Sequence, residues 1–432
     1  MMKKKVNVVT MGCSKNLVDS ELFLNQLQHN GYDVVHDSND TDARIVAVNT
    51  CGFILDAKEE SVEAIMNFVD AKNKGMVDKI FVFGCLSARY RDELVAEIPE
   101  VDGFYGKFEV KKMITDLKAN YYMSLSNERY LTTPSHYAFL KISEGCDRTC
   151  SYCAIPRMTG KHISKPMEDI IEEATLLAKK GVKELLIIAQ DLSFYGMDRY
   201  KKNMLDELLN KLADIPGIEW IKLHYAYPAG FPHKILPVMR ERKNIARYLD
   251  IALQHSSNRM LKIMRRNITR EKTIELLNRI RKEVPGIHIR TTMLVGHPGE
   301  TEEDFEDLKS FVREMRFERL GVFPYSFEED TYAGENYKDD VPQEVKEARA
   351  AELMEIQQEI AAGITAEKVG TEMKVLIDRK DEDFYVGRTE FDSPEVDGEV
   401  YIDSQGKELE VGTFCQVEIT HTNDYDLYGI TK

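Results

Sequence analysis

The sequence predicts an α/β protein of three domains, two built on parallel sheets and the last a small antiparallel β-barrel. Its 432 residues exceed the size of one ordinary domain. Strand-like and helix-like stretches alternate over about residues 1–120 and again over about 132–363, which is typical of βαβ units and a parallel sheet. Over about 366–432 the pattern changes to short alternating strands with Gly and Asp turns, which favours an antiparallel barrel or sandwich.

In the first domain, three apolar stretches are each followed by a helical pattern. The strands are expected at 5–10, 43–49 and 79–83, and the helices at 19–27, 58–71 and 93–97. Parallel strands bring their carboxyl ends to one edge of the sheet, where α/β proteins bind ligands. A site in this domain is therefore expected just after these strands.

The second domain repeats the alternation more often. Its strands are expected at 138–142, 184–188, 218–223, 248–251 and 288–294, with helices at 167–180 and 269–283. Six or so such repeats fit a complete or partial TIM-like β/α barrel whose active site lies at the carboxyl ends of the strands. A long helix at 341–369 leads into the last domain, whose strands are expected at 373–377, 384–388, 398–402 and 414–420.

The charge of the chain limits the partners it can take. A net charge of −16 disfavours a general nucleic-acid binder, which needs basic surface to neutralise phosphates. Residues 366–432 contain 17 Asp and Glu against 7 Lys and Arg, a net of −10, which leaves −6 for the first 365 residues. This acidic module either meets a basic partner or forms an ordinary solvated surface.

The sequence also bears on location. No apolar run reaches the roughly 18 to 20 residues that cross a bilayer, and the basic start leads into a strand and not into a signal peptide. We therefore expect a cytoplasmic protein with no membrane partner. Seven cysteines in a reducing compartment favour metal binding or catalysis over disulfides.

One loop holds three of the cysteines, Cys146, Cys150 and Cys153, with CxxxCxxC spacing, after the expected strand 138–142. Three thiolates this close can bind one soft or borderline metal centre, chiefly an iron–sulfur cluster or zinc. Three ligands leave one iron of a 4Fe–4S cluster open, whereas structural zinc needs a fourth ligand. His162 is the nearest candidate for that ligand, so a zinc site stays open as the alternative.

Three further cysteines, Cys13, Cys51 and Cys85, stand just after the three strands of the first domain. Because parallel strands end at one edge, these cysteines are expected to meet at one point. The alternative is three buried core cysteines, but those would lie within the strands. Cys415, on the strand expected at 414–420, is interpreted as a core residue.

Further motifs follow the barrel strands. Tyr152 precedes the last cysteine of the loop, and residues 189–196, 253–257 and 294–301 read AQDLSFYG, LQHSS and LVGHPGET. Together with the cysteine loop these stretches resemble the radical S-adenosylmethionine (SAM) superfamily. Ser256 and His297 stand where that family usually has Gly and Phe. Neither is expected to touch a cluster ligand, so the two departures bear only on the detail of the pocket.

The order of all six cysteines resembles the methylthiotransferase family over essentially the whole chain. That family has an N-terminal three-cysteine domain, a radical SAM core and a C-terminal TRAM domain, an OB-like barrel. Residues 11–21, MGCSKNLVDSE, resemble the branch that modifies a ribosomal protein. The acidic last domain favours the same branch, because a ribosomal protein is basic whereas tRNA would prefer Lys and Arg there.

The resemblance implies SAM and two 4Fe–4S clusters as cofactors. It assigns Cys146, Cys150 and Cys153 to the SAM-binding cluster. It assigns Cys13, Cys51 and Cys85 to a second cluster that carries an exogenous sulfur. Gln190 and Gln254 either line the SAM pocket or serve packing. It assigns no catalytic side chain beyond the cluster ligands.

The reaction that the resemblance implies is a transferase reaction. A SAM-derived 5′-deoxyadenosyl radical removes hydrogen from the β-carbon of an aspartate in small-subunit ribosomal protein number twelve, and a methylthio group is inserted there. A second SAM methylates the sulfur. The implied partners are the ribosomal protein, free or in the assembling ribosome, a reductant such as flavodoxin or ferredoxin, and a sulfur donor. The chain is expected to be a monomer.

Two other functions stay open. One is a tRNA methylthiotransferase that acts on a modified adenosine near the anticodon. The other is a non-catalytic two-cluster redox protein, although electron carriers usually saturate their clusters with four protein ligands. The basic run at 259–272 either contacts ribosomal RNA or, as we expect, forms a solvated helix face.

Overall fold

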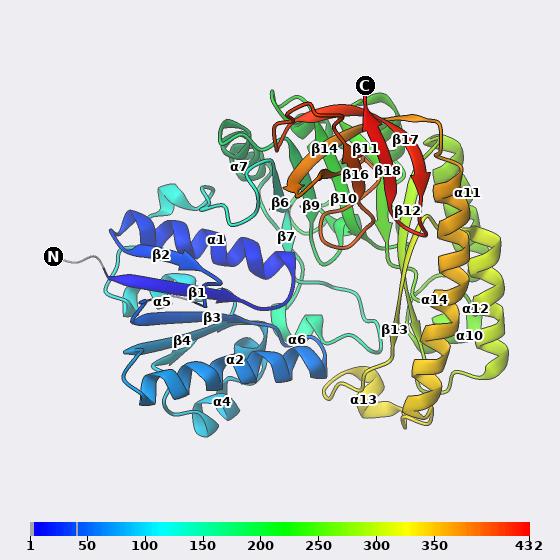
Figure 1. Ribbon diagram of the computed structural model, residues 1–432. Helices are drawn as coiled ribbons and strands as arrows, with labels where there is room; N and C mark the ends of the chain where they lie inside the picture. Colours follow the sequence, from blue (N-terminus) through cyan, green and yellow to red (C-terminus); the bar gives the residue numbers. More distant parts are fainter. Residues whose placement is uncertain (1–3, 40–41) are drawn as a thin grey trace.

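The computed structural model describes residues 4–39 and 42–432 and contains one main sheet for each expected domain (Figure 1). The N-terminal sheet is parallel throughout, in the order β2-β1-β3-β4-β5. Its strands are β1 (Lys5–Thr10), β2 (Asp33–His36), β3 (Ile45–Thr50), β4 (Lys79–Gly84) and β5 (Gly103–Phe104). Its helices are α1 (Ser14–His29), α2 (Leu55–Asn73), α3 (Cys85–Arg89), α4 (Arg91–Glu97) and α5 (Val110–Asp116).

Alternation along the buried strands explains why helices cover both faces of this sheet. Val48 of β3 packs with Ile65 of α2, whereas Ala47 packs on the opposite face with Phe23 of α1. The three expected strands are confirmed. The sequence does not predict β2 and β5, because such short strands at the sheet edges are selected by pairing with a neighbour.

The second sheet is an open barrel of six parallel strands in the order β13-β12-β11-β10-β9-β6. The strands are β6 (Tyr137–Lys141), β9 (Glu184–Ile188), β10 (Trp220–Ala226), β11 (Ile245–Ile251), β12 (His288–Val295) and β13 (Arg319–Pro324). The helices around it include α7 (Met167–Lys179), α8 (Leu205–Ala213), α9 (Ile235–Glu241), α11 (Arg270–Glu283) and α12 (Glu302–Met315). The partial barrel is therefore confirmed, with β13 as a strand that the sequence does not single out.

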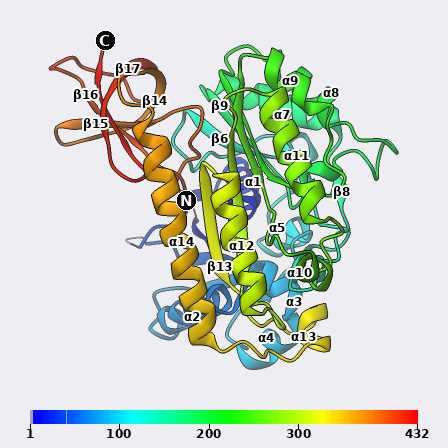
Figure 2. The same cartoon turned by 90° about the vertical axis from the view of Figure 1, so that its right-hand side faces the viewer.

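The helix α14 (Gln343–Ala366) connects the barrel to the C-terminal domain and also packs on the barrel. Leu353 and Ile356 belong to the barrel's own core, and Figure 2 shows α14 alongside β13 and α12. The C-terminal domain is a closed barrel of β14 (Glu372–Asp381), β15 (Phe384–Arg388), β16 (Val400–Asp403), β18 (Leu427–Thr431) and β17 (Phe414–Thr422).

One strand pair of this small barrel departs from the antiparallel expectation. β16 and β18 run parallel, because β18 inserts between β16 and β17 to close the barrel. Gly429 in β18 permits the close approach of β18 to β17, since a Cβ there would lie 2.5 Å from the carbonyl oxygen of Glu418 in β17. Cys415 is partly buried against the core of this barrel, as expected of a packing residue.

The two outer domains pack against different parts of the open barrel (Figure 1). The N-terminal domain packs along β6, where Val18 of α1 meets Tyr137 and Phe139, and it reaches the carboxyl end, where Lys58 and Arg89 bind Glu328 in the segment after β13. The C-terminal domain meets the amino end, where residues 388–397 reach into the barrel. No helix in the described ranges is long and apolar enough to cross a membrane.

The segment 388–397, between β15 and β16, closes the amino end of the six strands; we refer to it as the closing loop. Arg388 binds Glu184 at the start of β9 (2.8 Å), and Asp392 binds Arg319 at the start of β13 (2.7 Å). Asp397 accepts a hydrogen bond from Tyr248 of β11 (3.0 Å). Further contacts of the loop are with Tyr137, Lys222, Arg247, His288 and Arg290.

Candidate functional site

The three N-terminal cysteines lie together at the carboxyl edge of their sheet. Cys13 is the N-cap residue of α1, Cys51 follows β3 and Cys85 begins α3. A Cβ on Gly12 would lie 2.9 Å from the Cys51 sulfur, and a Cβ on Gly52 would lie 2.9 Å from the Leu86 backbone nitrogen. The three loops therefore pack directly on one another, as the sequence predicts.

Asn16 ties two of these loops together. Its side-chain amide donates to the carbonyl oxygens of Met11 (3.0 Å) and Thr50 (3.1 Å), and its Oδ1 lies 3.7 Å from the Cys85 sulfur. Cys85 is buried, Cys51 is half-buried and Cys13 is exposed. The alternative of three buried core cysteines is therefore wrong.

The electrostatic environment distinguishes the three thiols. Burial raises the pKa of Cys85 to about 12 and also raises the pKa of Cys51. At Cys13, desolvation is outweighed by the ammonium groups of Lys15 and Lys107, which lower the pKa of that thiol. Neutral buried thiols become metal ligands when the metal takes the place of the proton, so this set suits a metal centre that is itself the main local charge.

The CxxxCxxC loop is held by a short hairpin after β6. β7 (Ser143–Glu144) pairs with β8 (Ile163–Ser164), and the Cys146 amide donates to the Gly160 carbonyl (3.1 Å). The Arg148 amide donates to the Cys146 sulfur (3.4 Å), and the Cys153 amide to the Cys150 carbonyl (3.2 Å). Burial raises the pKa of both Cys146 and Cys153 to about 12.

Two arginines and a tyrosine support this loop, and the sequence does not predict them as a group. Arg266 is buried and donates to the Cys150 sulfur (3.2 Å) and the Tyr152 hydroxyl (3.3 Å). The Tyr227 ring lies between two guanidinium groups, 4.1 Å from that of Arg148 and 4.2 Å from that of Arg266. Tyr227 stands just after a barrel strand, a position that signals a site residue.

The basic run at 259–272 is therefore not simply a solvated helix face. Arg266 lies against a cysteine of the loop, and Met260, Leu261 and Met264 are buried. The expectation holds for Arg259, Lys262 and Lys272, which are exposed, and fails at Arg266, where positive φ at Arg265 and Asn267 accompanies an inward turn of the chain after the short helix α10 (Asn258–Ile263).

The two residues that depart from the family motifs have separate roles. His297 Nε2 lies 2.9 Å from the hydroxyl of Ser151, between two cysteines of the loop, and its ring meets Tyr152 and Tyr325 edge-on. Burial lowers the pKa of His297 to about 4, so the ring is neutral. Ser256 donates to Asp307 (2.7 Å), away from the cysteines.

The two glutamines both lie at the carboxyl ends of barrel strands. Gln190 follows β9 and donates to Glu144, two residues before Cys146, while no described residue donates to its buried Oε1. Gln254 follows β11, has φ +75° and pairs with Met293 through its backbone. Both residues therefore lie at the edge of the barrel where sites are built.

The two three-cysteine sets are neighbours. Cys85 packs against Ala154 and Met158, in the segment that follows Cys153 and includes α6 (Ile155–Thr159). Among the described residues, no group of His, Cys, Asp or Glu is arranged to hold a single metal ion, and the His162 ring contacts Ser164 and Phe194. Thiol-only sets of three fit iron–sulfur clusters, in which each sulfur binds a different iron, better than zinc.

An open parallel barrel with a three-cysteine loop after its first strand defines the class of radical SAM enzymes. Residues 140–312 match the model of the Radical SAM superfamily, residues 5–106 match "Uncharacterized protein family UPF0004", and residues 369–431 match the TRAM domain.

Curated relatives cover the chain from end to end. The ribosomal protein uS12 methylthiotransferases RimO of Bacteroides thetaiotaomicron and Bacteroides fragilis are 59% and 57% identical over 429 residues, 99% of this chain and 98% and 99% of theirs. The RimO protein of Cytophaga hutchinsonii is 53% identical over 427 residues, 99% of this chain and 98% of its own. The chain belongs to the RimO family of methylthiotransferases.

Solved structures support the fold alone. The radical SAM methyltransferase TsrM from Kitasatospora setae, with cobalamin and a [4Fe-4S] cluster bound, superposes with a TM-score of 0.55 at 13% identity and covers 77% of each chain. The cobalamin-dependent enzyme OxsB gives a TM-score of 0.52 at 13% identity, over 83% of this chain and 56% of that one.

Proposed function

We propose that this protein is a methylthiotransferase that modifies ribosomal protein uS12, using SAM and two 4Fe–4S clusters. The observation that carries the proposal is the juxtaposition of two three-cysteine sets from different domains at the carboxyl end of one barrel. One set alone would serve radical formation, and the second provides a place for the sulfur to be transferred. Whole-chain identity of up to 59% to curated RimO proteins gives the substrate class.

In this proposal each cysteine set binds one cluster. Cys146, Cys150 and Cys153 hold the SAM-binding cluster, and Cys13, Cys51 and Cys85 hold the second. When bound, SAM and the clusters supply the radical chemistry and the sulfur. The chain's own part is to orient the cluster loop through Arg266 and His297 and to exclude water from its sulfurs.

Gln190 and Gln254 are proposed to line the SAM pocket. Gln190 is held by Glu144 beside the cysteine loop, and its second amide atom remains available to a ligand. Arg148, Asp191 and Tyr227 form the neighbouring wall, where Arg148 binds Asp191 (2.7 Å). A charged amino acid moiety such as that of SAM suits such a mixed polar wall.

The finer points of the proposal are the acceptor atom and the partners. The acceptor is the β-carbon of an aspartate in uS12, reached on the free protein or in the assembling ribosome. A flavodoxin or ferredoxin supplies electrons and a separate donor supplies sulfur. The protein acts as a monomer in the cytoplasm.

The choice between a protein and a tRNA substrate is tested by one competition experiment. Purified enzyme with reconstituted clusters is given SAM, sulfide and a reductant, together with uS12 and tRNA in one reaction. We expect a methylthio mass gain on uS12 alone, with 5′-deoxyadenosine formed in parallel. A mass gain on tRNA alone would favour the tRNA branch, and absence of 5′-deoxyadenosine would favour the non-catalytic redox protein.

A further inference from the structure

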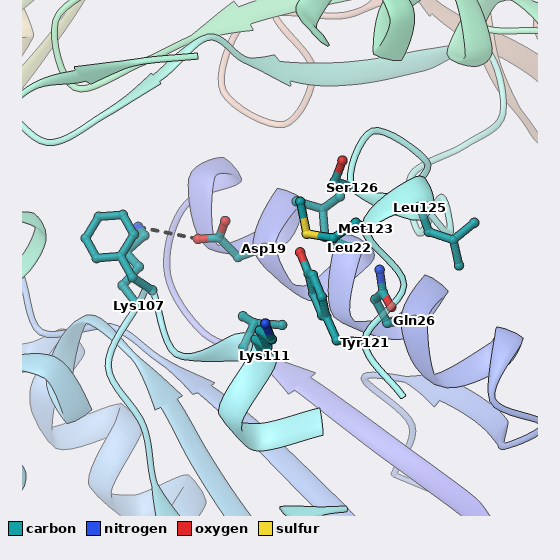
Figure 3. Close-up of a pocket in the computed structure, with 11 residues that line it drawn as sticks. Asp19, Leu22, Gln26, Lys107, Lys111, Tyr121, Met123, Leu125 and Ser126 are labelled. Atoms are coloured by element: carbon teal, nitrogen blue, oxygen red, sulfur yellow. Dashed lines mark ion pairs between the residues drawn. The ribbon is translucent and has the colours of Figure 1, made fainter. Parts of the chain in front are cut away.

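A buried lysine lies beside the N-terminal cysteine set and also binds Glu144, two residues before the other set. Lys107 follows β5, and its side chain is 4% exposed. Its Nζ lies 3.8 Å from the Cys85 sulfur, 3.3 Å from Glu144 Oε1 and 3.6 Å from Asp19 Oδ2. Figure 3 shows Lys107 and its ion pair with Asp19 at one end of a cavity of about 340 Å³ between α1 and α5.

Lys107 shares its carboxylates with a second lysine. Lys141 of β6 also binds Asp19 and Glu144, the latter at 2.7 Å. The four side chains come from α1, β6, β7 and the segment after β5, so the group joins the N-terminal domain to the barrel. Of the two lysines, Lys107 is the one for which a contact to a cysteine sulfur is found.

Glu144 extends this group toward the other cysteine set. It lies two residues before Cys146 and accepts a hydrogen bond from Gln190. A continuous series of contacts therefore runs from the Cys85 sulfur through Lys107 and Glu144 to Gln190. It links the N-terminal set to the edge of the barrel where SAM is proposed to bind.

Burying the Lys107 ammonium group costs free energy unless neighbouring charges compensate it. An ammonium group taken out of water needs compensating charges, and replacing a buried ion pair by apolar groups is often neutral or stabilising. Without Lys107, Asp19 and Glu144 would be paired with Lys141 alone. The group would then carry a net negative charge beside cysteine thiolates that are themselves negative when they bind iron. Lys107 corrects this balance and directs an N–H donor at a cysteine sulfur, an interaction that tunes iron–sulfur potentials.

The geometry points to Lys107 as a positioning residue that stabilises the reduced form of the N-terminal cluster and aligns that cluster with the SAM side through Glu144. This inference rests on the proposed function, because it requires a cluster at Cys13, Cys51 and Cys85. A cation close to a ligand sulfur favours the more negative, reduced state, and so raises the reduction potential.

The experiment compares Lys107→Met with Lys141→Met in the full chain. Both variants remove one lysine from the same four-charge group, but only the first removes the contact to the Cys85 sulfur. Both are made with Cys146, Cys150 and Cys153 changed to Ala, so that the remaining iron reports on the N-terminal cluster. Midpoint potentials are measured by dithionite titration followed by electron paramagnetic resonance.

We expect Lys107→Met to lower the midpoint potential clearly more than Lys141→Met does, and Lys107→Arg to restore most of the difference. If Lys107→Met loses its iron while Lys141→Met keeps it, the sulfur contact is needed to hold the cluster, which supports the same role. Equal potentials, or equal loss of iron in both variants, would show that Lys107 serves only the domain contact and would overturn the inference.

Failure of the proposed function gives a different result. If uS12 gains no methylthio group but the triple-alanine parent holds about four irons, the potentials of the variants still decide the role of Lys107. If that parent contains no iron at all, whatever stands at position 107, the second cluster itself is absent and the proposed function fails with it. Thermal unfolding of the variants provides a second readout, since a merely structural lysine changes the melting temperature without separating the two variants in potential.

Discussion

At the scale of single residues, Gly12 determines how closely two cysteine loops approach. It has φ +87°, and a Cβ there would lie 2.7 Å from Cys51 Cβ, a separation that real Cβ atoms do not tolerate. The clashing neighbour, Cys51, is a proposed cluster ligand. Any movement that relieves the clash therefore displaces that ligand. Gly12 is thus required by the geometry of the site and not only by its backbone angle.

Gly12→Ala is expected to remove the N-terminal cluster while the SAM-binding cluster remains. The parent should hold about eight irons, four per cluster, and the variant about four. Gly31→Ala is the matched control, because Gly31 has φ +80° and a Cβ there would meet nothing within 4 Å. Iron and sulfide analysis decides, and equal iron in both variants would contradict the prediction.

Other residue-scale features lie beyond what a sequence shows. The six cysteines can be placed at strand ends from the pattern alone, since parallel strands share an edge. Lys107 and Arg266 cannot, because each contacts a cysteine distant in sequence (Cys85 and Cys150) through turns that no periodicity marks. The fold imposes the positive φ of Arg265, and the identity of the residue, an arginine, does not predict it.

At the scale of elements, the closing loop makes the C-terminal domain part of the barrel's interior. Arg388, Glu184 and Lys222 have side chains 0–3% exposed and form one ion group at the amino end of the strands, in which Arg388 also compensates the charge of Asp378 (2.7 Å). Breaking a buried pair by removing one partner leaves an uncompensated charge, which costs about 3–5 kcal/mol.

Arg388→Met is therefore expected to lower the free energy of unfolding by about 3–5 kcal/mol. Arg379→Met is the control: the Arg379–Glu399 pair is 47% and 31% exposed, so its loss should cost only about 0–1 kcal/mol. Urea denaturation followed by circular dichroism measures both. Similar midpoints for the two variants would show that the closing loop does not stabilise the barrel.

The elements themselves are mostly predictable, and their contacts are not. The named strands of all three domains are found, because long apolar runs and period-2 alternation are local signals. The sequence misses β2, β5, β7, β8, β13 and β18, and it does not show that 388–397 enters another domain. That segment reads as a polar turn, and its ion partners start strands that are distant in sequence.

At the scale of the whole molecule, the acidic charge of the last domain is partly internal. Asp392 and Asp397 are 1–2% exposed and pair with Arg319 and Arg290, so they present no charge to a partner. The outward acidity comes from other carboxylates that are exposed, among them Asp381, Glu408 and Glu410. This exposed charge still has the sign that attracts a basic ribosomal protein.

Association with uS12 should therefore depend on ionic strength. Raising the salt concentration from low to well above physiological values is expected to slow association by roughly tenfold or more, because exposed charges are screened. Stopped-flow or surface-based association rates measure this. SAM cleavage in the absence of uS12 is the control and should change little; a salt-independent association rate would contradict electrostatic attraction.

The closing loop also constrains how such proteins can diversify. A family model assigns residues 369–431 to a separate TRAM domain, which suggests a unit that could be exchanged independently of the barrel. Its loop nevertheless supplies polar partners to three residues at the amino end of the barrel strands: Arg388 binds Glu184, Asp392 binds Arg319, and the Thr389 carbonyl accepts from Lys222. A chimera with the TRAM domain of a distant relative would also need matching residues at the amino end of the barrel strands. The two regions are thus bound to change together over evolution, and a gene fusion or truncation at their boundary would cut through one folding unit.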